Sequence, residues 1–480
     1  MPTYQKWYMD DGGIIGDTAL LMKVWEILKS DGPDLGMLLN PEKCEWSWLN
    51  PECNEPCPIE LVQLVPTHKI QMLGVPLGSD PFVADYVERE LLPTEKVTQQ
   101  LVEFEDTQSA MYLLRLSFGI VRANHFMRTT PLRQWEEHAK KFDATIRGAT
   151  ELIIKHNLPS AAYDQACVST RFGGLGIRKV VDHAPIAFAA SYNESHAQCG
   201  ESWMNVTKVP EGAPSQRAGS ETLDKKTLDR LIEQGNDREK QRLRRLDCKH
   251  ANSWITSLPS ATDGRDTIMD PKIYSTAVAR LLGLPVYNNS IPCPLCQQSM
   301  DVLGDHALCC KKTQDTITRH NRVRNLMFKL GELGVLSPQM EKLGLLGPTD
   351  DSKRRPGDVS FANWRNGRGL AIDVAVICPL AASHLHQEEP CEIYAERQKH
   401  KRYDAGFKGS RYEFAAMVFE TSGAVNSEGN DIIKQLIRFA SKRECVGNSS
   451  FAGRTWARIS CCIQTSVAQA ILNRDYDEVR

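Results

Sequence analysis

The stretch RPGDVSFANWRNGRGLAIDVAVICP, residues 355–379, predicts the part of the fold that carries the chemistry. Its two apolar runs flank Asn366-Gly367, a dipeptide typical of the tight turn between antiparallel strands. A two-residue turn would pair Arg365 with Arg368. The sequence therefore predicts a hairpin, and the strand-like and helix-like segments around it predict a small α/β domain.

Two acidic residues, Asp358 and Asp373, are expected to meet on this hairpin. A regular ladder would place Ser360 opposite Asp373, so that Asp358 projects from the same face as a diagonal neighbour. Two carboxylates held this way on apolar strands repel each other unless a cation lies between them. A Mg²⁺ ion would meet that need, and it could polarise a phosphodiester and activate water. We therefore predict a catalytic magnesium site with these two acids as ligands.

A nuclease site of this kind also uses a lysine to orient water or to neutralise the charge that develops on the phosphate. The position two residues after Asp373 is Ala375, so the lysine must come from elsewhere. The helix-like segment AERQKHKRY, residues 395–403, offers Lys399, with Lys401 as the fallback. Each of these residues alone also fits a turn cap or a solvated helix charge. Together, in this order and spacing, they predict nuclease activity.

A cysteine and histidine cluster precedes the hairpin. Cys293 and Cys296 form a CxxC, and His306 is followed by the adjacent thiols Cys309 and Cys310. Two ligands from a tight turn and two from the next short segment fit a tetrahedral Zn²⁺ ion. We prefer Cys310 as the fourth ligand, because three intervening residues let a helical turn bring it beside His306. The alternative is a pair of buried cysteines with an unrelated histidine.

Bulk charge does not identify a nucleic-acid-binding protein. The chain has 58 basic and 60 acidic residues, for a formal net charge of −2. Two local basic runs could nevertheless contact phosphates, and one of these runs also contains His320. Such runs are, however, commonly solvated helix faces. The expected nucleic-acid contacts are Arg319, Arg322, Arg324, Arg354, Arg355, Lys401 and Arg402.

The odd number of cysteines, fifteen, argues against a secreted disulfide framework. No apolar segment of signal type opens the chain, and no stretch approaches the roughly 20 apolar residues that span a bilayer. We expect a soluble nuclear or cytoplasmic protein with no membrane partner.

The first 80 residues predict a strand, a helix, a strand and a hairpin. The stretch WYMDDGGIIG contains Asp10 and Asp11, an acidic pair of the kind that holds metal ions in polymerase palms. No acidic residue precedes Tyr8, so one carboxylate pair is all that this segment supplies.

Near the other end, a closing helix is expected from about Asp431.

In this order, the parts resemble the carboxy-terminal part of the polyprotein of non-LTR retrotransposons that carry a restriction-like endonuclease. WYMDDGGIIG is similar to the palm motif, LLNPEKCEW with Lys43 to the motif after it, MLGVPLG to the primer-grip hairpin, and HANSWITSLP to the family's linker motif. The cysteine cluster resembles a CCHC zinc knuckle, and RPGD, AIDVAV and AERQKHKRY resemble a PD-(D/E)xK-like nuclease whose lysine has moved to a helix.

The resemblance implies a multidomain α+β protein. The expected domains are a partial palm at 1–84, a helical thumb at 85–206, a charged linker at 207–285, a zinc knuckle with a basic helix at 286–330 and the nuclease at 331–480.

The family's activity is to nick chromosomal DNA and to copy template RNA from the freed end. We expect this chain, which looks like a truncated element, to nick DNA with Mg²⁺ and to bind a structural Zn²⁺, but not to polymerise alone. Two alternatives stay open: a non-catalytic zinc-knuckle protein that binds nucleic acid, and an intact reverse transcriptase that would need a carboxylate from another chain.

Overall fold

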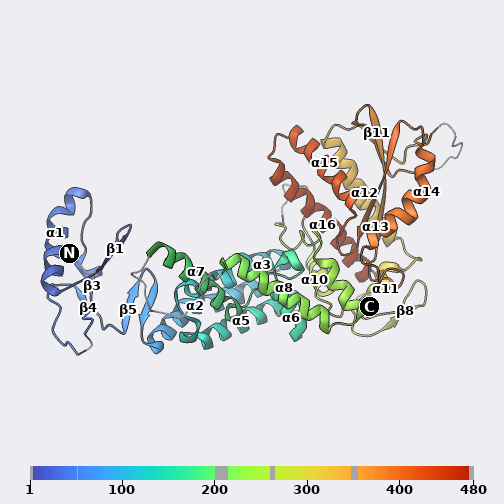
Figure 1. Cartoon of the computed structure of the whole chain (residues 1–480). Coiled ribbons are helices and arrows are strands. Elements are labelled where there is room, and N and C mark those ends of the chain that lie inside the picture. Colours follow the sequence, from blue (N-terminus) through green and yellow to red (C-terminus); the bar gives the residue numbers. More distant parts are fainter. Residues whose placement is uncertain (1–3, 51, 200–213, 260–264, 348–354, 475–480) are drawn as a thin grey trace. The chain divides into compact units, whose positions relative to one another are not determined.

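The computed structural model describes residues 4–50, 52–199, 214–259, 265–347 and 355–474 (Figure 1). The fold is mixed α+β, with many helices and small sheets. It divides into two compact units. Unit 1 comprises residues 1–96, 122–144 and 180–216, and unit 2 comprises residues 97–121, 145–179 and 217–480. These boundaries cross the segment 85–206 that the sequence assigns to a single helical domain.

The described residues up to Gly78 begin with a hairpin where the sequence predicts a single strand. A hairpin of β1 and β2 turns at Met9, which has a φ of +53°. Asp17 then caps α1 by accepting a hydrogen bond from the Leu20 N–H. A short parallel pair and a second hairpin follow. The elements are β1 (Tyr4–Tyr8), β2 (Asp11–Ile15), α1 (Thr18–Asp31), η1 (Pro33–Leu35), η2 (Pro41–Lys43), β3 (Glu45–Trp46), β4 (Gln63–Leu64), β5 (Lys69–Met72) and β6 (Val75–Gly78).

Helices make up the next part of the chain. Those of unit 1 are α4 (Asn124–Thr129), η5 (Leu132–Gln134) and α7 (Val180–Cys199), and those of unit 2 are α3 (Thr107–Leu113), η3 (Leu114–Phe118), α6 (Ser160–Cys167), η6 (Thr170–Phe172), α9 (Asp237–Leu246) and α10 (Pro271–Leu281). Four further elements contain residues of both units, namely α2 (Asp80–Val102), η4 (Ile120–Ala123), α5 (Glu136–Ile154) and α8 (Gln216–Gln234).

Unit 2 contains the largest sheet among the described residues, with strand order β12-β11-β10-β9. Its strands are β9 (Pro338–Met340), β10 (Val359–Arg365), β11 (Arg368–Ile377) and β12 (Tyr412–Glu420). The three pairs β9/β10, β10/β11 and β11/β12 are antiparallel, antiparallel and parallel. The parallel pair requires a crossover. That crossover contains α13 (Pro390–Tyr394), η8 (Ala395–His400), α14 (Lys401–Tyr403) and η9 (Asp404–Phe407).

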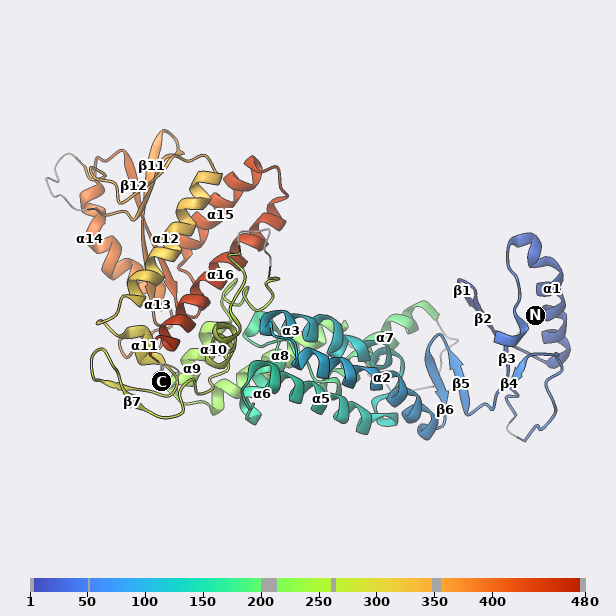
Figure 2. The ribbon, with the colours of Figure 1, turned by 180° about the vertical axis from the view of Figure 1, so that it is seen from behind.

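Helices cover both faces of this sheet (Figures 1 and 2). On one face, α12 (Asp315–Leu333), α15 (Ser427–Arg443) and α16 (Asn448–Leu472) pack in one cluster with Ile372 and Val374 of β11. On the other face, Ala375 and Ile377 pack against α13 and η8. Helix α15 begins four residues before the expected Asp431, and α16 was not predicted. Asp373 alternates with Ile372 and Val374, so it shares the face of Ala375.

The cysteine-rich segment belongs to the same hydrophobic core as the sheet. It contains β7 (Ile291–Pro292), β8 (Ser299–Met300) and α11 (Asp305–Cys309). Cys293, Met300 and Leu308 are buried in one cluster with Phe361 of β10. The expected boundary between residues 330 and 331 lies within α12, whose Val323 and Met327 belong to that cluster. The knuckle segment and the sheet are therefore packed as one body.

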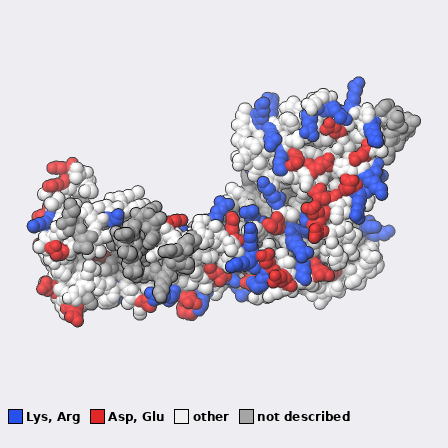
Figure 3. Space-filling view, viewed as in Figure 1, with Lys and Arg blue, Asp and Glu red and all other residues white. Residues whose placement is uncertain are grey.

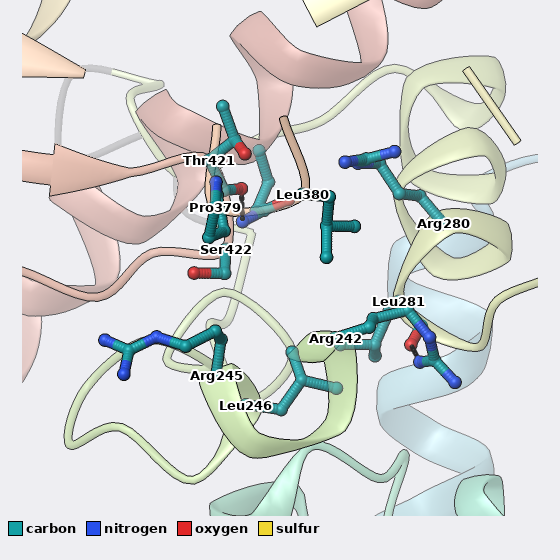
Figure 4. Close-up of a pocket in the computed structure, with 10 residues that line it drawn as sticks. Arg242, Arg245, Leu246, Arg280, Leu281, Pro379, Leu380, Thr421 and Ser422 are labelled. Atoms are coloured by element: carbon teal, nitrogen blue, oxygen red, sulfur yellow. Dashed lines mark hydrogen bonds between the residues drawn. The ribbon is translucent and has the colours of Figure 1, made fainter. Parts of the chain in front are cut away.

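Helix α9, expected in a charged linker, packs on the carboxyl end of β12. Arg245 lies 2.8 Å from the fully buried carboxylate of Glu420, and Gln241 donates to the Gln387 carbonyl at 2.8 Å. Figure 4 shows the cleft between α9, α10 and the ends of β11 and β12. The guanidinium groups of Arg242 and Arg245 point away from each other there, each toward acceptors of its own. Both arginines are thus used in contacts within the protein, and the cleft does not present them as a pair to an anion.

The β10–β11 hairpin has the two-residue turn that the sequence predicts. Asn366 and Gly367 have φ angles of +52° and +72°, and Arg365 pairs with Arg368 across them. The next pair is Phe361 with Leu370, so that residues 362–364 face residue 369 alone. This bulge shifts the register.

The predicted register was therefore wrong beyond the turn. Ser360 pairs with Ala371 rather than with Asp373. The absence of a side chain at Gly369 permits the bulge. A Cβ atom there would lie 2.4 Å from the Tyr412 ring and 2.8 Å from the Phe361 carbonyl oxygen.

None of the helices in the described part of the chain is long and apolar enough to span a bilayer.

Gly369→Ala should lower the free energy of unfolding by about 1–3 kcal/mol, because the added methyl group overpacks the hairpin. Urea denaturation followed by tryptophan fluorescence would measure the change. Gly453→Ala is the matched control: Gly453 lies in α16 with open space around its Cβ position. Alanine there should stabilise the helix by about 0.5–1 kcal/mol. Equal effects of the two substitutions would contradict the role of Gly369.

Candidate active site and metal centre

Asp358 lies directly before β10 and is fixed against β11. Its backbone N–H donates to the Ile372 carbonyl at 2.8 Å, and its Oδ2 accepts from the Val374 N–H at 2.7 Å. The carboxylate thus satisfies a backbone donor beyond the end of the ladder. This arrangement brings Asp358 within hydrogen-bonding reach of the Asp373 carboxyl group. The two acids meet although the predicted register was wrong.

Asp373 is 8% exposed and has two charged neighbours. Lys399 Nζ lies 2.9 Å from its Oδ1, and Asp358 lies on its other side. Burial raises the pKa of Asp373 to about 6; the Lys399 ammonium opposes the rise and the Asp358 carboxylate adds to it. A second cation near the pair would stabilise the ionised form of Asp373.

Lys399 reaches Asp373 from a π-helical turn, η8. Such wide turns are rare and are frequent at functional sites. Ala395, the first residue of the turn, is buried against Ala375 and Ala416, so the turn is held close to the sheet. Lys399 is largely buried, whereas Lys401 is exposed on α14. The structure therefore brings the preferred lysine, and not the fallback, to the acids.

His320 of α12 also contacts the acidic pair. Its Nε2 lies 3.1 Å from Asp358 Oδ2, and its Nδ1 lies 3.2 Å from Asn321 Oδ1. The hydrogen bond to Asp358 raises the pKa of His320, although burial opposes this. Burial would raise the pKa of Asp358, but the contacts with His320 and Val374 outweigh it and hold that pKa below its usual range. His320 thus favours the ionised form of Asp358.

These contacts leave one oxygen of each acid without an N–H donor among the described residues, namely Asp358 Oδ1 and Asp373 Oδ2. Carboxylate oxygens are the ligands that Mg²⁺ prefers. Lys399 is the charged group paired with Asp373, through the other oxygen of that carboxylate.

The four sulfur and nitrogen ligands of the knuckle converge. Cys293 Sγ lies 4.0 Å from Cys310 Sγ, and Cys296 Sγ lies 3.2 Å from His306 Nε2. All four ligand atoms lie within 4.8 Å of one another, so this cluster could hold a metal ion. Three thiols and an imidazole are a donor set that suits zinc. Cys309 is not in the cluster and lies beside Cys378 instead.

Asp301 fixes the second half of this cluster. Its Oδ1 accepts from the Leu303 and Asp305 N–H groups, and its Oδ2 accepts from the His306 N–H. These bonds satisfy the free N–H groups at the start of α11 and orient His306. Asp305 in turn binds Arg280 at 2.8 Å, which ties the segment to α10.

The basic residues of α12 do not form one surface. Arg319 is 2% exposed and donates to the Leu308 carbonyl, so it is turned into the core, contrary to the expectation. Arg322 donates to Ser466 of α16, and Arg324 binds Glu341. The three side chains have different partners and therefore do not form a common basic surface.

The other predicted contacts are more accessible. Arg355 is exposed and lies 3.3 Å from Glu341, and Lys401 and Arg402 are exposed on α14. Arg354 lies outside the described residues. Figure 3 shows basic side chains interspersed with acidic ones over unit 2, in keeping with the net charge.

Asp10 and Asp11 lie exposed at the tip of the β1–β2 hairpin. The Cys/His cluster is the one group of three or more candidate ligands among the described residues, so no third such ligand lies near this pair.

Sequence reasoning placed His320 in a phosphate-binding helix and did not assign Asp301. His320 is 38 residues away from Asp358, and no local pattern marks such a contact. Asp301 could have been recognised, because an acid shortly before a helix start is a typical cap.

No protein-family model matches the chain, and no curated protein matches it significantly. The assignment of a function therefore rests on the geometry of the described residues.

Removal of the knuckle metal should destabilise the sheet as well as the knuckle, because Cys293 and Cys310 belong to the core that contains Phe361. Cys296→Ser should abolish the bound zinc measured by mass spectrometry and lower the melting temperature. Cys445→Ser, at an exposed cysteine outside the cluster, is the control and should change neither quantity. A zinc-free wild-type protein with unchanged melting after chelation would contradict a structural metal.

Proposed function

We propose that this chain contains a Mg²⁺-dependent DNA endonuclease. The observation that carries the proposal is the meeting of Asp358, Asp373 and Lys399, which come from the start of β10, the middle of β11 and the π-helical turn η8. A buried acid whose pKa is raised by burial and by a neighbouring acid, and which is paired with a lysine, is typical of a catalytic site.

Asp358 and Asp373 would hold the Mg²⁺ ion through the two oxygens that receive no N–H donor. When bound, the ion would polarise the scissile phosphodiester and promote ionisation of an attacking water. Lys399 would neutralise negative charge on the phosphate oxygens or orient the water, from its place 2.9 Å from Asp373. His320 would keep Asp358 in position as an ionised ligand.

We further infer that the chain belongs to the carboxy-terminal part of a non-LTR retrotransposon polyprotein. Support comes from the order of its parts: a hairpin bearing two acids, a helical region, a Cys/His cluster and a sheet with an acid pair and a lysine. The partner would be duplex target DNA and, in the whole polyprotein, template RNA. The cluster would hold a structural Zn²⁺, because four protein donors leave no open coordination position.

Asp373→Ala should abolish nicking of a supercoiled plasmid in Mg²⁺ while the protein stays folded. Lys399→Ala should slow nicking by about 100-fold or more, as expected for a group that stabilises developing charge. Lys225→Ala on α8 is the control, since it removes the same charge from an exposed side chain that is not among the predicted nucleic-acid contacts. The measurement is the rate of conversion to open-circular DNA, with a chelator as blank. Nicking by the Asp373→Ala protein would overturn the assignment.

His320→Ala should raise the Mg²⁺ concentration needed for half-maximal nicking by about 10-fold, because residues that orient metal ligands typically cost 10–100-fold in metal affinity or activity. The maximal rate at saturating Mg²⁺ should fall much less. A titration of nicking rate against Mg²⁺ separates the two effects. A lower maximal rate with an unchanged midpoint would show that His320 acts in another way.

A second candidate is a non-catalytic protein that binds nucleic acid. The Lys399 ammonium already neutralises Asp373, and His320 and Val374 already hold Asp358, so the acids are satisfied by protein groups. This reading expects salt-sensitive DNA binding and no Mg²⁺-dependent nicking, which the plasmid experiment distinguishes from the first.

A further inference from the structure

Helix α15 carries a row of cations on its exposed side. Lys434, Arg438 and Lys442 are spaced by four residues, so they follow one another along one face at steps of about 6 Å. Like charges at this spacing repel each other. Asp431 pairs with Lys434 at 2.9 Å, but Arg438 and Lys442 have no acidic partner within ion-pair distance in the described part of the chain.

The opposite side of α15 is apolar and explains why the row faces outward. Ile433, Leu436 and Ile437 are buried in the core against the sheet. The dipole of the helix favours cations in its last turn, which accounts for Lys442. The helix dipole does not account for Lys434 and Arg438, which lie before the last turn of α15.

An exposed aromatic ring lies next to the row. Phe439 is 38% exposed, although large apolar side chains of α15 are otherwise buried. Its ring packs edge-on against Trp364, with the centroids 5.8 Å apart, so the ring is held in place. A fixed, accessible aromatic ring beside cations is the arrangement with which proteins bind single-stranded nucleic acid, by stacking a base and contacting phosphates.

The row is separate from the acidic pair. Asp373 projects toward the face covered by α13 and η8, whereas α15 covers the other face (Figures 1 and 2). A strand bound along α15 is therefore not held at the cleavage site. The basic residues near that site, such as Lys401 and Arg402, belong to α14.

We propose that the outer face of α15 binds a single strand of nucleic acid, with Arg438 and Lys442 on phosphates and Phe439 on a base. This second site goes beyond the nuclease proposal and does not depend on hydrolysis. Charge complementarity and the exposed ring both favour a single strand of nucleic acid as the occupant of this site.

The test uses the full chain with Asp373→Ala, so that the proposed cleavage cannot occur, and a fluorescent single-stranded oligonucleotide of mixed sequence in buffer without Mg²⁺. Binding is measured by anisotropy over a range of salt concentrations. Arg438→Gln with Lys442→Gln should weaken binding roughly tenfold at moderate salt. The slope of log affinity against log salt should fall by about 1.4, or about 0.7 for each lost phosphate contact on a single strand.

The matched control is Lys225→Gln with Lys226→Gln, which removes two exposed lysines from α8. It should leave the affinity and the slope unchanged. Phe439→Leu keeps an apolar contact to Trp364 but removes the flat ring, so it should weaken binding without changing the slope. A duplex of the same sequence should bind α15 more weakly than the single strand.

Equal losses in the α8 and α15 double variants would overturn the proposal, since charge alone would explain them. So would an unchanged affinity in the α15 variant, an unchanged affinity in Phe439→Leu, or tighter binding of the duplex through the same residues. Plasmid nicking by the α15 variants in the background that retains Asp373 reports separately on the nuclease proposal, because these residues do not contact the acidic pair.

Discussion

The burial of two carboxyl groups side by side is the constraint on which the sheet region of unit 2 depends. Asp373 lies among alanine and isoleucine side chains on a strand that is almost wholly buried, and Asp358 is within hydrogen-bonding reach of it. Burying a charge is costly unless it is paired and hydrogen-bonded. Three groups offset this cost. Lys399 of the crossover pairs with Asp373, whereas the Val374 N–H and His320 of α12 bind Asp358. Loss of any one would leave a buried charge less compensated.

Two local departures from regular structure accompany this arrangement. The π-helical turn η8 brings Lys399 to the sheet, and the bulge opposite Gly369 moves Asp358 beside Asp373. Irregular elements of this kind persist where the surrounding packing over-determines them. Here the buried Ala395 and the close contact of Gly369 with Tyr412 provide that packing. Both irregularities help to bring charged groups to the acidic pair.

The sequence predicted the features that short-range physics decides. The Asn366-Gly367 turn, the pairing of Arg365 with Arg368 and the α/β alternation follow from turn chemistry and side-chain periodicity. The register of the β10–β11 ladder was not predictable. The bulge depends on the close approach of Tyr412 from β12, which is possible because Gly369 has no Cβ atom. Nor was the burial of Arg319 predictable, since its environment is formed by segments far away in the chain. The contact of His320 with Asp358 was not predictable for the same reason.

The Cys/His cluster and the acidic pair are joined through α12. The helix begins five residues after Cys310, its Val323 and Met327 pack in the core shared by the cluster and the sheet, and its His320 holds Asp358. A rigid helix transmits a displacement at its start to the side chains along it. An ion in the cluster would therefore fix more than the knuckle: by setting where α12 begins, it would set where His320 and, through it, one of the two acids can lie. On this argument the Cys/His cluster and the acidic pair form one mechanical unit, although no residue belongs to both.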